Sequence, residues 1–184
     1  MAHKTRDQVA ICPFVSTQRG NDDHMDEADK KGAREIRERL NEKARAYAAL
    51  DVKGVLDLYE NSDEVSVFDP GPPDEYLGFD AVTQTIGNFI LGAETMELTY
   101  QGDRAVASGN YGTAWSLVRI KTLLKNGVNV DVICRQTNVW RRSEDGVWRV
   151  IHEHNSVPMS PEHADALFSQ DPELAERLGS DSAG

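Results

Sequence analysis

Basic residues are scarce in this chain of 184 amino acids, where 20 Lys and Arg stand against 31 Asp and Glu, for a formal net charge of −11. Phosphate backbones and anionic lipid repel a protein of that charge, so neither nucleic acid nor a membrane surface is an expected partner. Long hydrophobic runs are also missing, since no apolar stretch approaches the roughly 20 residues that span a bilayer.

Cysteine is scarce as well, with only Cys12 and Cys134 in the chain. Their wide separation fits reduced thiols in a cytoplasmic protein rather than a disulfide framework. The apolar residues 9–15 are too few, and too interrupted by Pro13, for a signal peptide. The sequence also lacks a phosphate-binding loop, a dinucleotide-binding glycine fingerprint and a nucleophile elbow, so no cofactor is expected.

Three regions differ in composition. Residues 1–31 are polar and charged and are predicted to form an N-terminal arm, either loosely attached or docked through the apolar residues around Phe14. Residues 32–157 are predicted to form one folded domain. Residues 158–184 are predicted to form a helical tail, with short helices at 160–168 and 171–178 that each begin near a proline.

The first half of the domain has helical periodicity. Apolar residues recur every three or four positions from Gly32, Asp51 is a candidate cap for a second short helix, and a third helix is predicted after Gly78. Residues 65–68 predict a short strand, which the proline-rich segment from Pro70 ends.

The second half of the domain has a period of two, which predicts four antiparallel strands at about 95–101, 104–121, 128–141 and 147–157. The dipeptides Asn126-Gly127 and Asp145-Gly146 are signals for two-residue hairpin loops. Helices followed by a long meander indicate an α+β fold, in which a strongly bent antiparallel sheet wraps around the N-terminal helices.

These two loops determine which side chains share a face of the sheet. The predicted pocket face mixes large apolar groups with amides and one carboxylate: Trp115, Leu117, Gln136, Asn138, Trp140, Ile151, Glu153 and Asn155. The opposite face carries Val118, Ile120, Ile133, Arg135, Thr137, Val139, Val150, His152 and His154. Its apolar centre is expected to be covered by another subunit in a homodimer or homotrimer. A bulge of one residue would exchange the two sets.

The order of elements and three segments resemble the nuclear transport factor 2-like superfamily, and within it the SnoaL-like and ketosteroid-isomerase-like branch. The segments are 48–51, 67–70 with Gly78 after it, and the closing run 146–156, within a resemblance that covers about residues 33–157. The resemblance implies a cone-shaped α+β barrel that encloses an apolar pocket, and such a pocket is the usual place for a small ligand.

The resemblance also points to a catalytic carboxylate. In ketosteroid isomerases the aspartate of a similar Val-x-Asp-Pro segment is the general base, and the matching position here is Asp69. A base of this kind needs a pocket that draws its pKa toward the working pH by desolvation. The alternative is that Asp69 only caps the turn before Pro70.

The paired oxyanion donors of those isomerases are not reproduced. Their helix tyrosine matches Ala46, adjacent to Tyr47, and their protonated aspartate matches Gln136. Amide donors from Gln136 and Asn138 could take over that role.

Three further side chains are candidates for acid–base chemistry. Glu153 either has a raised pKa beside Trp140, or pairs with Arg119 or Lys121, or lies exposed at the pocket mouth. Tyr59 either packs in the core or presents its hydroxyl to the cavity. Lys121 is either a solvated lysine or a desolvated proton donor.

The expected ligand is a small hydrophobic, aromatic molecule. The residues expected to bind it are Trp115, Gln136, Asn138, Trp140 and Asn155, with His152, His154 and Arg135 added if the register is shifted. The two histidines share a face and would be compatible with a metal, but no third ligand accompanies them in sequence, so no metal site is predicted.

Two functional hypotheses follow. The first is a cofactor-independent acid–base enzyme, an isomerase, dehydratase or lyase, that uses Asp69, Glu153, Tyr59 and Lys121. Within the superfamily, the deformylating diarylpropane lyases of lignin-dimer catabolism are a specific possibility. The second hypothesis is a non-catalytic ligand-binding or oligomerisation module, whose pocket would be filled by side chains. An enclosed cavity of at least about 300 Å³, lined by the two carboxylates, would favour the enzyme.

Overall fold

The computed structural model describes residues 26–71 and 73–160. The predicted arm up to residue 25, with Cys12, and the predicted tail helices beyond residue 160 lie outside the described residues. In the described part the elements follow the order α1 (Glu27–Ala48), α2 (Val52–Leu56), β1 (Ser66–Phe68), β2 (Glu75–Leu77), α3 (Phe79–Gly92), β3 (Ala93–Ser108), β4 (Tyr111–Leu124), β5 (Asn129–Arg142) and β6 (Trp148–Ser156). No helix among these combines the length and apolar character needed to cross a bilayer.

The helix α1 begins at Glu27, earlier than the start predicted at Gly32. Asp26 sets this start, because its carboxylate accepts a hydrogen bond from the backbone N–H of Asp29 at 2.8 Å and so caps the first turn. The helix packs mainly against β3. Its buried side is apolar apart from one lysine and consists of Gly32, Ala33, Ile36, Leu40, Lys43 and Tyr47.

The other two predicted helices are confirmed. Asp51 caps α2, because its carboxylate accepts a hydrogen bond from the backbone N–H of Gly54 at 3.0 Å. The helix α3 begins after Gly78, whose φ of 80° lies in the left-handed region that glycine tolerates best.

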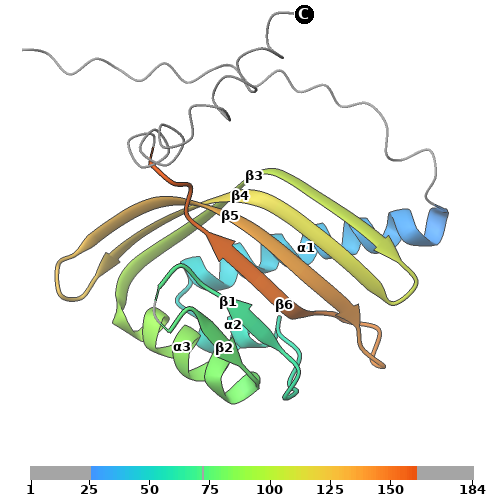
Figure 1. Ribbon diagram of the computed structural model, residues 1–184, viewed down its shortest axis with the longest axis horizontal. Helices are drawn as coiled ribbons and strands as arrows, with labels where there is room; N and C mark the ends of the chain where they lie inside the picture. The colour runs from blue at the N-terminus through green and yellow to red at the C-terminus, as the bar shows by residue number, and fades with distance from the viewer. Residues whose placement is uncertain (1–25, 72, 161–184) are drawn as a thin grey trace, which may run out of the picture.

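The six strands form one curved sheet in the order β2-β1-β6-β5-β4-β3, and the helices lie on its concave side (Figure 1). The predicted α+β class is confirmed, and the sheet remains open, with β2 and β3 as its edges. The short strand β1 runs parallel to β6, while β2 folds back antiparallel on β1 after the proline-rich turn. This arrangement places the C-terminal end of β1 beside the middle of β6.

The predicted break between strands 95–101 and 104–121 is wrong. The residues assigned to a turn near 102–103 lie within the continuous strand β3, where a register shift between Gln101 and Arg104 accommodates Gly102 at a φ of 64°. The chain reverses later, between Ser108 and Tyr111. Glycine at positive φ therefore marks a bulge at the first site, where the sequence suggested a turn.

The predicted pairing of β4 with β5 is also wrong, by one residue. Lys121 lies opposite Asp131 rather than Val132, because the loop contains three residues and closes with a hydrogen bond of 2.8 Å from Leu124 N–H to the Val128 carbonyl. The φ of Gly127 is 84°, as expected for the last residue of a three-residue hairpin loop. The shift turns β4 over, so Trp115 and Leu117 lie on the outer face, and Val118 and Ile120 on the concave face.

The loop between β5 and β6 is also one residue longer than predicted, yet the predicted pairs further along are confirmed. The backbone N–H of Ser143 donates to the Val147 carbonyl across the turn. A bulge at Ile151 then restores the predicted register. Gln136 therefore lies opposite Asn155, and Asn138 lies opposite Glu153. These four polar side chains line up on two neighbouring strands of the concave face.

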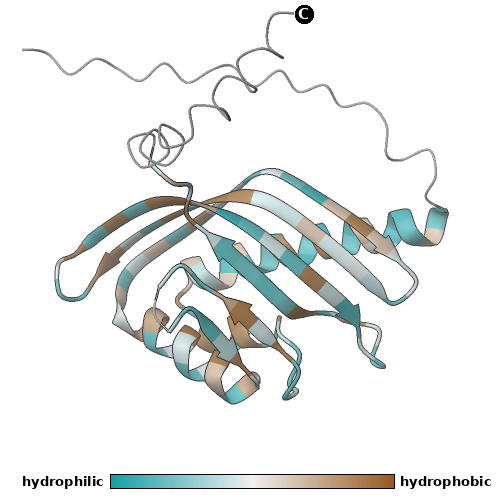
Figure 2. Cartoon of the chain, in the orientation of Figure 1, coloured by the Kyte–Doolittle hydropathy of each residue, from teal (hydrophilic) through white to brown (hydrophobic). Residues whose placement is uncertain are grey.

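The hydrophobic core lies between the helices and the concave face of the sheet. Its largest side chains are Trp140 and Trp148, both buried, together with Ile36 and Leu40 of α1. Figure 2 shows hydrophobic and hydrophilic residues interspersed along the long strands.

Candidate functional site

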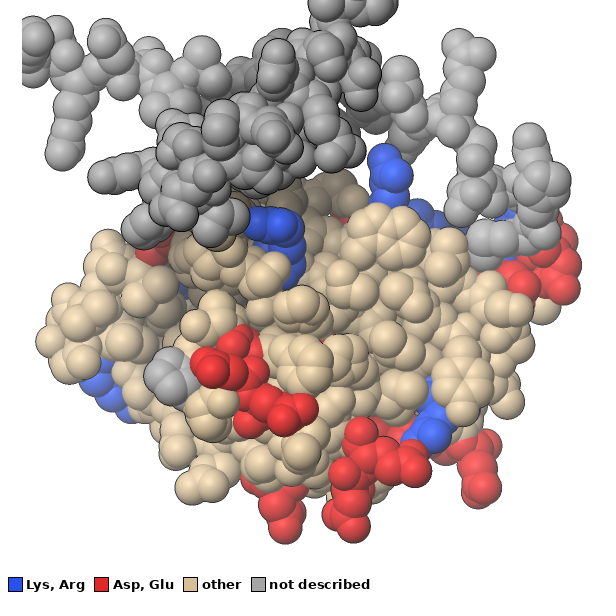
Figure 3. Space-filling view, viewed as in Figure 1, with Lys and Arg blue, Asp and Glu red and all other residues tan. Residues whose placement is uncertain are grey.

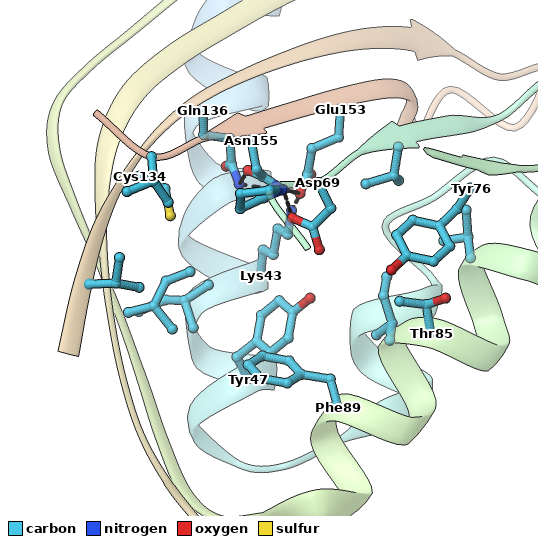
Figure 4. A pocket seen from close by; sticks show the side chains of 18 of the residues that line it. Lys43, Tyr47, Asp69, Tyr76, Thr85, Phe89, Cys134, Gln136, Glu153 and Asn155 are labelled. Atoms are coloured by element: carbon cyan, nitrogen blue, oxygen red, sulfur yellow. Dashed lines mark hydrogen bonds and ion pairs between the residues drawn. The ribbon is translucent and has the colours of Figure 1, made fainter. Parts of the chain in front are cut away.

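A cavity of about 350 Å³ opens between the concave face of the sheet and the helices α1 and α3. Its walls are largely apolar and include Leu98, Ile120, Val132, Ile86 and Phe89. One end is polar, and there the side chains of Lys43, Asp69, Gln136, Glu153 and Asn155 converge (Figure 4). The cavity therefore combines an apolar body with a few convergent polar groups, which is typical of small-molecule sites.

Glu153 lies at the centre of the polar end and is only 4% exposed. Its carboxylate forms an ion pair with Lys43, which is itself 1% exposed. It also accepts hydrogen bonds from Tyr59 Oη (3.0 Å), Asn138 Nδ2 (2.7 Å), Gln136 Nε2 (3.2 Å) and Asn155 Nδ2 (3.0 Å). Five side chains therefore stabilise its negative charge.

The electrostatics of Glu153 differ from the prediction. Burial alone would raise its pKa, but Lys43 and the hydrogen bonds outweigh burial and hold the pKa below its ordinary value of 4.5. The predicted raised pKa is therefore wrong, as is a pairing with Arg119 or Lys121. The charge of Glu153 is therefore paired, and both of its oxygens are occupied by donors.

Lys43 is the residue of the site that sequence reasoning missed. A signal was present, because Ile36, Leu40, Lys43 and Tyr47 follow the spacing of one helix face, and the other three are apolar or aromatic. A lysine on such a face is buried only if an acidic partner meets it. Glu153, predicted to lie on the pocket side of the sheet, was the available partner.

Asp69 follows β1 and presents its carboxylate to the same cavity. Among the described residues, its hydrogen-bond partner is Asn155, whose Nδ2 donates to Asp69 Oδ1 at 3.3 Å. Burial and the nearby charge of Glu153 raise the pKa of Asp69, against the smaller opposing effects of Asn155 and Lys43. Asp69 is therefore the cavity carboxylate with a free oxygen and an increased proton affinity.

Three tyrosines also line the cavity: Tyr47, Tyr59 and Tyr76. The Tyr59 hydroxyl donates to Glu153 at the polar end of the cavity, and its ring is buried. The core position and the cavity-facing hydroxyl, which were predicted as alternatives, therefore occur together. The hydroxyl of Tyr47 points toward Asp69 (Figure 4). Burial, Glu153 and Asp69 all raise the pKa of Tyr47, so its hydroxyl stays protonated. A helix tyrosine is thus present in the cavity, one position after Ala46.

The predicted site residues divide into those the fold brings together and those it does not. The cavity is lined by Asp69, Glu153, Tyr59, Gln136 and Asn155. Asn138 is not among the lining residues, but its amide donates to Glu153. Trp140 is in the core with no exposed surface.

The remaining predicted residues lie on the outer face of the sheet, away from the cavity. Trp115 is 37% exposed, and Lys121, Arg135 and His154 are exposed. His152 is half-buried and contacts Ser66 Oγ through its Nδ1 at 2.8 Å. Self-association through this face remains a prediction.

The charged surface contrasts with the cavity. In the view of Figure 3, acidic side chains gather along the lower rim and in one group left of centre, and uncharged side chains cover most of the rest of the face. Among residues 26–71 and 73–160, no three His, Cys, Asp or Glu side chains are grouped to hold a metal ion. The described cavity itself presents carboxylate, hydroxyl, amide, ammonium and thiol groups.

Comparison with known proteins places the chain in a family. The model of the SnoaL-like domain matches residues 36–160. None of the curated proteins matches the sequence.

Solved structures of low sequence identity share the fold. An NTF2-like superfamily protein from Salmonella enterica serovar Typhimurium is 20% identical, with a TM-score of 0.62, over 70% of this chain and 92% of that one. A candidate dehydratase of the NTF2-like family from Streptomyces avermitilis is 18% identical, with a TM-score of 0.63, over 71% and 99%. A ketosteroid isomerase-like protein from Erwinia carotovora atroseptica is 17% identical, with a TM-score of 0.59, over 71% and 98%.

These likenesses extend to the fold, and the diarylpropane lyase gains no support from them. The family match covers α1 from residue 36 onward, the other helices, the sheet and every described side chain of the cavity. The chain therefore belongs to the SnoaL-like domain family.

Proposed function

We propose that the protein is a cofactor-independent acid–base enzyme of the isomerase or dehydratase type, acting on a small hydrophobic molecule. The observation that carries this proposal is Asp69, a carboxylate with a raised pKa and one hydrogen-bond donor, at the edge of a largely apolar cavity of about 350 Å³. A carboxylate in such surroundings is a stronger base than one in water. The names of two structural neighbours, a candidate dehydratase and a ketosteroid isomerase-like protein, agree with this reaction type.

The proposed step is proton removal from a carbon next to a carbonyl group. Asp69 accepts the proton, the C–H electron pair moves into the adjacent bond, and the carbonyl oxygen gains negative charge. The Tyr47 hydroxyl, which stays protonated, donates a hydrogen bond to that oxygen. In a β,γ-unsaturated ketone, return of that proton from Asp69 to the γ-carbon completes an isomerisation. In a β-hydroxy ketone, the hydroxyl takes that proton from Asp69 and leaves as water, which completes a dehydration.

Glu153 supports this step without taking part in it. Through Asn155, which donates to both carboxylates, it fixes the amide that holds Asp69. Its charge also raises the pKa of Asp69. No contact in the described part of the cavity singles out a diarylpropane, so that narrower activity remains a prediction of the sequence. Its expected proton donor Lys121 is exposed and does not line the cavity.

The proposal is tested by hydrogen exchange. A panel of small cyclic and aromatic ketones is incubated with the protein in D2O, and loss of the α-proton signal is followed by NMR. We expect the protein to exchange at least one ketone faster than buffer does, and Asp69→Asn to lose that activity. Exchange that continues unchanged in Asp69→Asn would contradict the assignment of the base.

The alternative, a non-catalytic binding module, is favoured by one feature, the saturated hydrogen bonding of Glu153. It predicts that ketones bind without exchange. Its expectation of a filled pocket and of equally satisfied carboxylates does not fit the open cavity and the single donor to Asp69.

A further inference from the structure

The outer face of the sheet, on the side away from the cavity, carries an exposed apolar patch. We call Trp115, Leu117 and Ile133 the outer patch, and their exposed fractions are 37%, 43% and 42%. They are neighbours, because Trp115 and Leu117 are two residues apart on β4 and Ile133 lies diagonally across from Leu117 on β5. A group of exposed apolar side chains on a folded domain marks an interaction surface.

Positive charge accompanies the outer patch. Arg104 and Arg135 lie directly opposite its two β4 residues in the sheet. Neither arginine has an acidic partner at ion-pair distance in the part of the chain that the structure describes. Asp131, further along β5, is paired with Arg119 at 2.8 Å, and Glu97 lies further along β3. The outer patch therefore suits an occupant that combines apolar with acidic side chains.

The chain leaves the sheet beside this patch. Ser156, the last residue of β6, pairs with Arg135, and residues 157–160 are exposed. In Figure 1 this segment turns toward the convex side of the sheet, away from the helices. Leu117 lies two strands from Ser156, roughly 10 Å away. An eight-residue helix is ~12 Å long, so a helix that begins near residue 160 reaches the outer patch.

The sequence that follows Ser160, from 161 to 184, has matching chemistry. Its charged residues are six acids and one arginine: Glu162, Asp165, Asp171, Glu173, Glu176, Asp181 and Arg177. Its apolar residues have helical spacing at Ala164, Leu167 and Phe168, and again at Leu174 and Leu178. An acidic segment with an apolar face is thus joined to the domain beside a basic and apolar surface.

We propose that the segment 161–178 docks on the outer patch of its own chain, with Leu167 and Phe168 against the apolar side chains and its acids toward Arg104 and Arg135. A second copy of the chain, the occupant expected from the sequence, fits this surface less well. A two-fold contact sets the same cations of both copies against each other, which costs energy when no acid separates them. The docked segment covers the outer face and leaves the cavity, on the concave face, accessible.

Trp115 reports on this contact, because the other two tryptophans, Trp140 and Trp148, are buried. Acrylamide quenching of fluorescence is measured on the full chain, and Trp115→Phe assigns the signal of Trp115. We expect weak quenching of Trp115 in wild type. The double variant Leu167→Ser with Phe168→Ser should raise its quenching constant severalfold, because it removes the apolar contact. The matched control Phe14→Ser, in the N-terminal segment, should leave the constant unchanged.

A charge reversal tests the electrostatic part of the contact. Arg135→Glu should also raise the quenching of Trp115, whereas Lys125→Glu, at an exposed position between β4 and β5, should not. The inference is overturned by equal quenching in wild type and the double variant, by no effect of Arg135→Glu, or by exposure of Trp115 in Phe14→Ser. It is also overturned if the protection is lost on dilution and sedimentation shows a dimer, since the occupant is then a second copy.

Discussion

Asp69 and Glu153 lie in the same polar end of one cavity, yet their surroundings give them opposite properties. Glu153 is almost completely buried, receives five donors including the Lys43 ammonium, and has a lowered pKa. Asp69 is partly exposed, receives one donor among the described residues, and has a raised pKa. The number and charge of the donors, rather than the depth of burial, therefore account for the opposite directions of the two pKa shifts.

The comparison assigns different roles to the two groups. The pairing of Glu153 with Lys43 fixes α1 to β6, and the amides around it hold the cavity in shape. Asp69 remains available at the end of β1. Substitutions at the two positions should therefore affect different measurements.

The largest expected effect is on activity at Asp69. Replacement by Asn keeps the shape and removes the base, so the ketone exchange rate should fall by about 10²–10⁴-fold. The free energy of unfolding should change by less than about 1 kcal/mol, because the side chain is partly exposed. A stability loss as large as that of a Glu153 variant would remove the distinction between the two carboxylates.

The second effect is on stability at Lys43. Its replacement by Met leaves the buried Glu153 charge without its cation, which should lower the free energy of unfolding by about 3–5 kcal/mol. Denaturant unfolding followed by circular dichroism measures the change. Lys31→Met, on an exposed position of the same helix, is the matched control and should change stability by less than about 0.5 kcal/mol.

A smaller effect is the coupling between the two partners. Glu153→Gln alone leaves Lys43 unpaired, whereas the double variant Lys43→Met with Glu153→Gln removes both charges. A double-mutant cycle should give a coupling of about 2–3 kcal/mol, and the same cycle between Lys43 and Asp69 should give less than about 1 kcal/mol. Equal couplings would show that Lys43 does not prefer Glu153.

The smallest effect is on the pH dependence of stability, and its sign differs between the two groups. The pKa of Asp69 is raised above 3.8, so its contribution is fully present below that pH and is lost as the pH rises through the folded value. The pKa of Glu153 is lowered below 4.5, so its contribution is present above that pH and is lost as the pH falls through the folded value. The free energy of unfolding of wild type, Asp69→Asn and Glu153→Gln is measured from pH 3 to 7. The difference between wild type and variant should change with pH in opposite directions for the two variants.

Much of the fold could be predicted from the sequence because its signals are local. Asp51 and Gly78 mark helix starts through short-range hydrogen bonding and backbone conformation, and both predictions are confirmed. The loops were harder, since a dipeptide such as Asn126-Gly127 ends a three-residue loop as readily as it forms a two-residue one. An error of one residue there reverses every side chain of β4.

The same error had different consequences for the site in the two hairpins. Between β5 and β6 the bulge at Ile151 cancelled it, so Gln136, Asn155 and Glu153 were assigned to the correct face. Between β4 and β5 nothing cancelled it, so Trp115 was assigned to the pocket but lies outside. A bulge depends on packing across the sheet, and no local pattern in the sequence indicates it.

The different properties of the two carboxylates are tested most directly by measuring both pKa values in one experiment. Carbonyl-detected NMR of the 13C-labelled protein follows each carboxyl carbon through a pH titration, with Asp69→Asn and Glu153→Gln used to assign the two signals. The structure predicts that Asp69 titrates above the ordinary aspartate value of 3.8 and Glu153 below the ordinary glutamate value of 4.5. A Glu153 signal that titrates above that of Asp69 would contradict the assignment of Asp69 as the base.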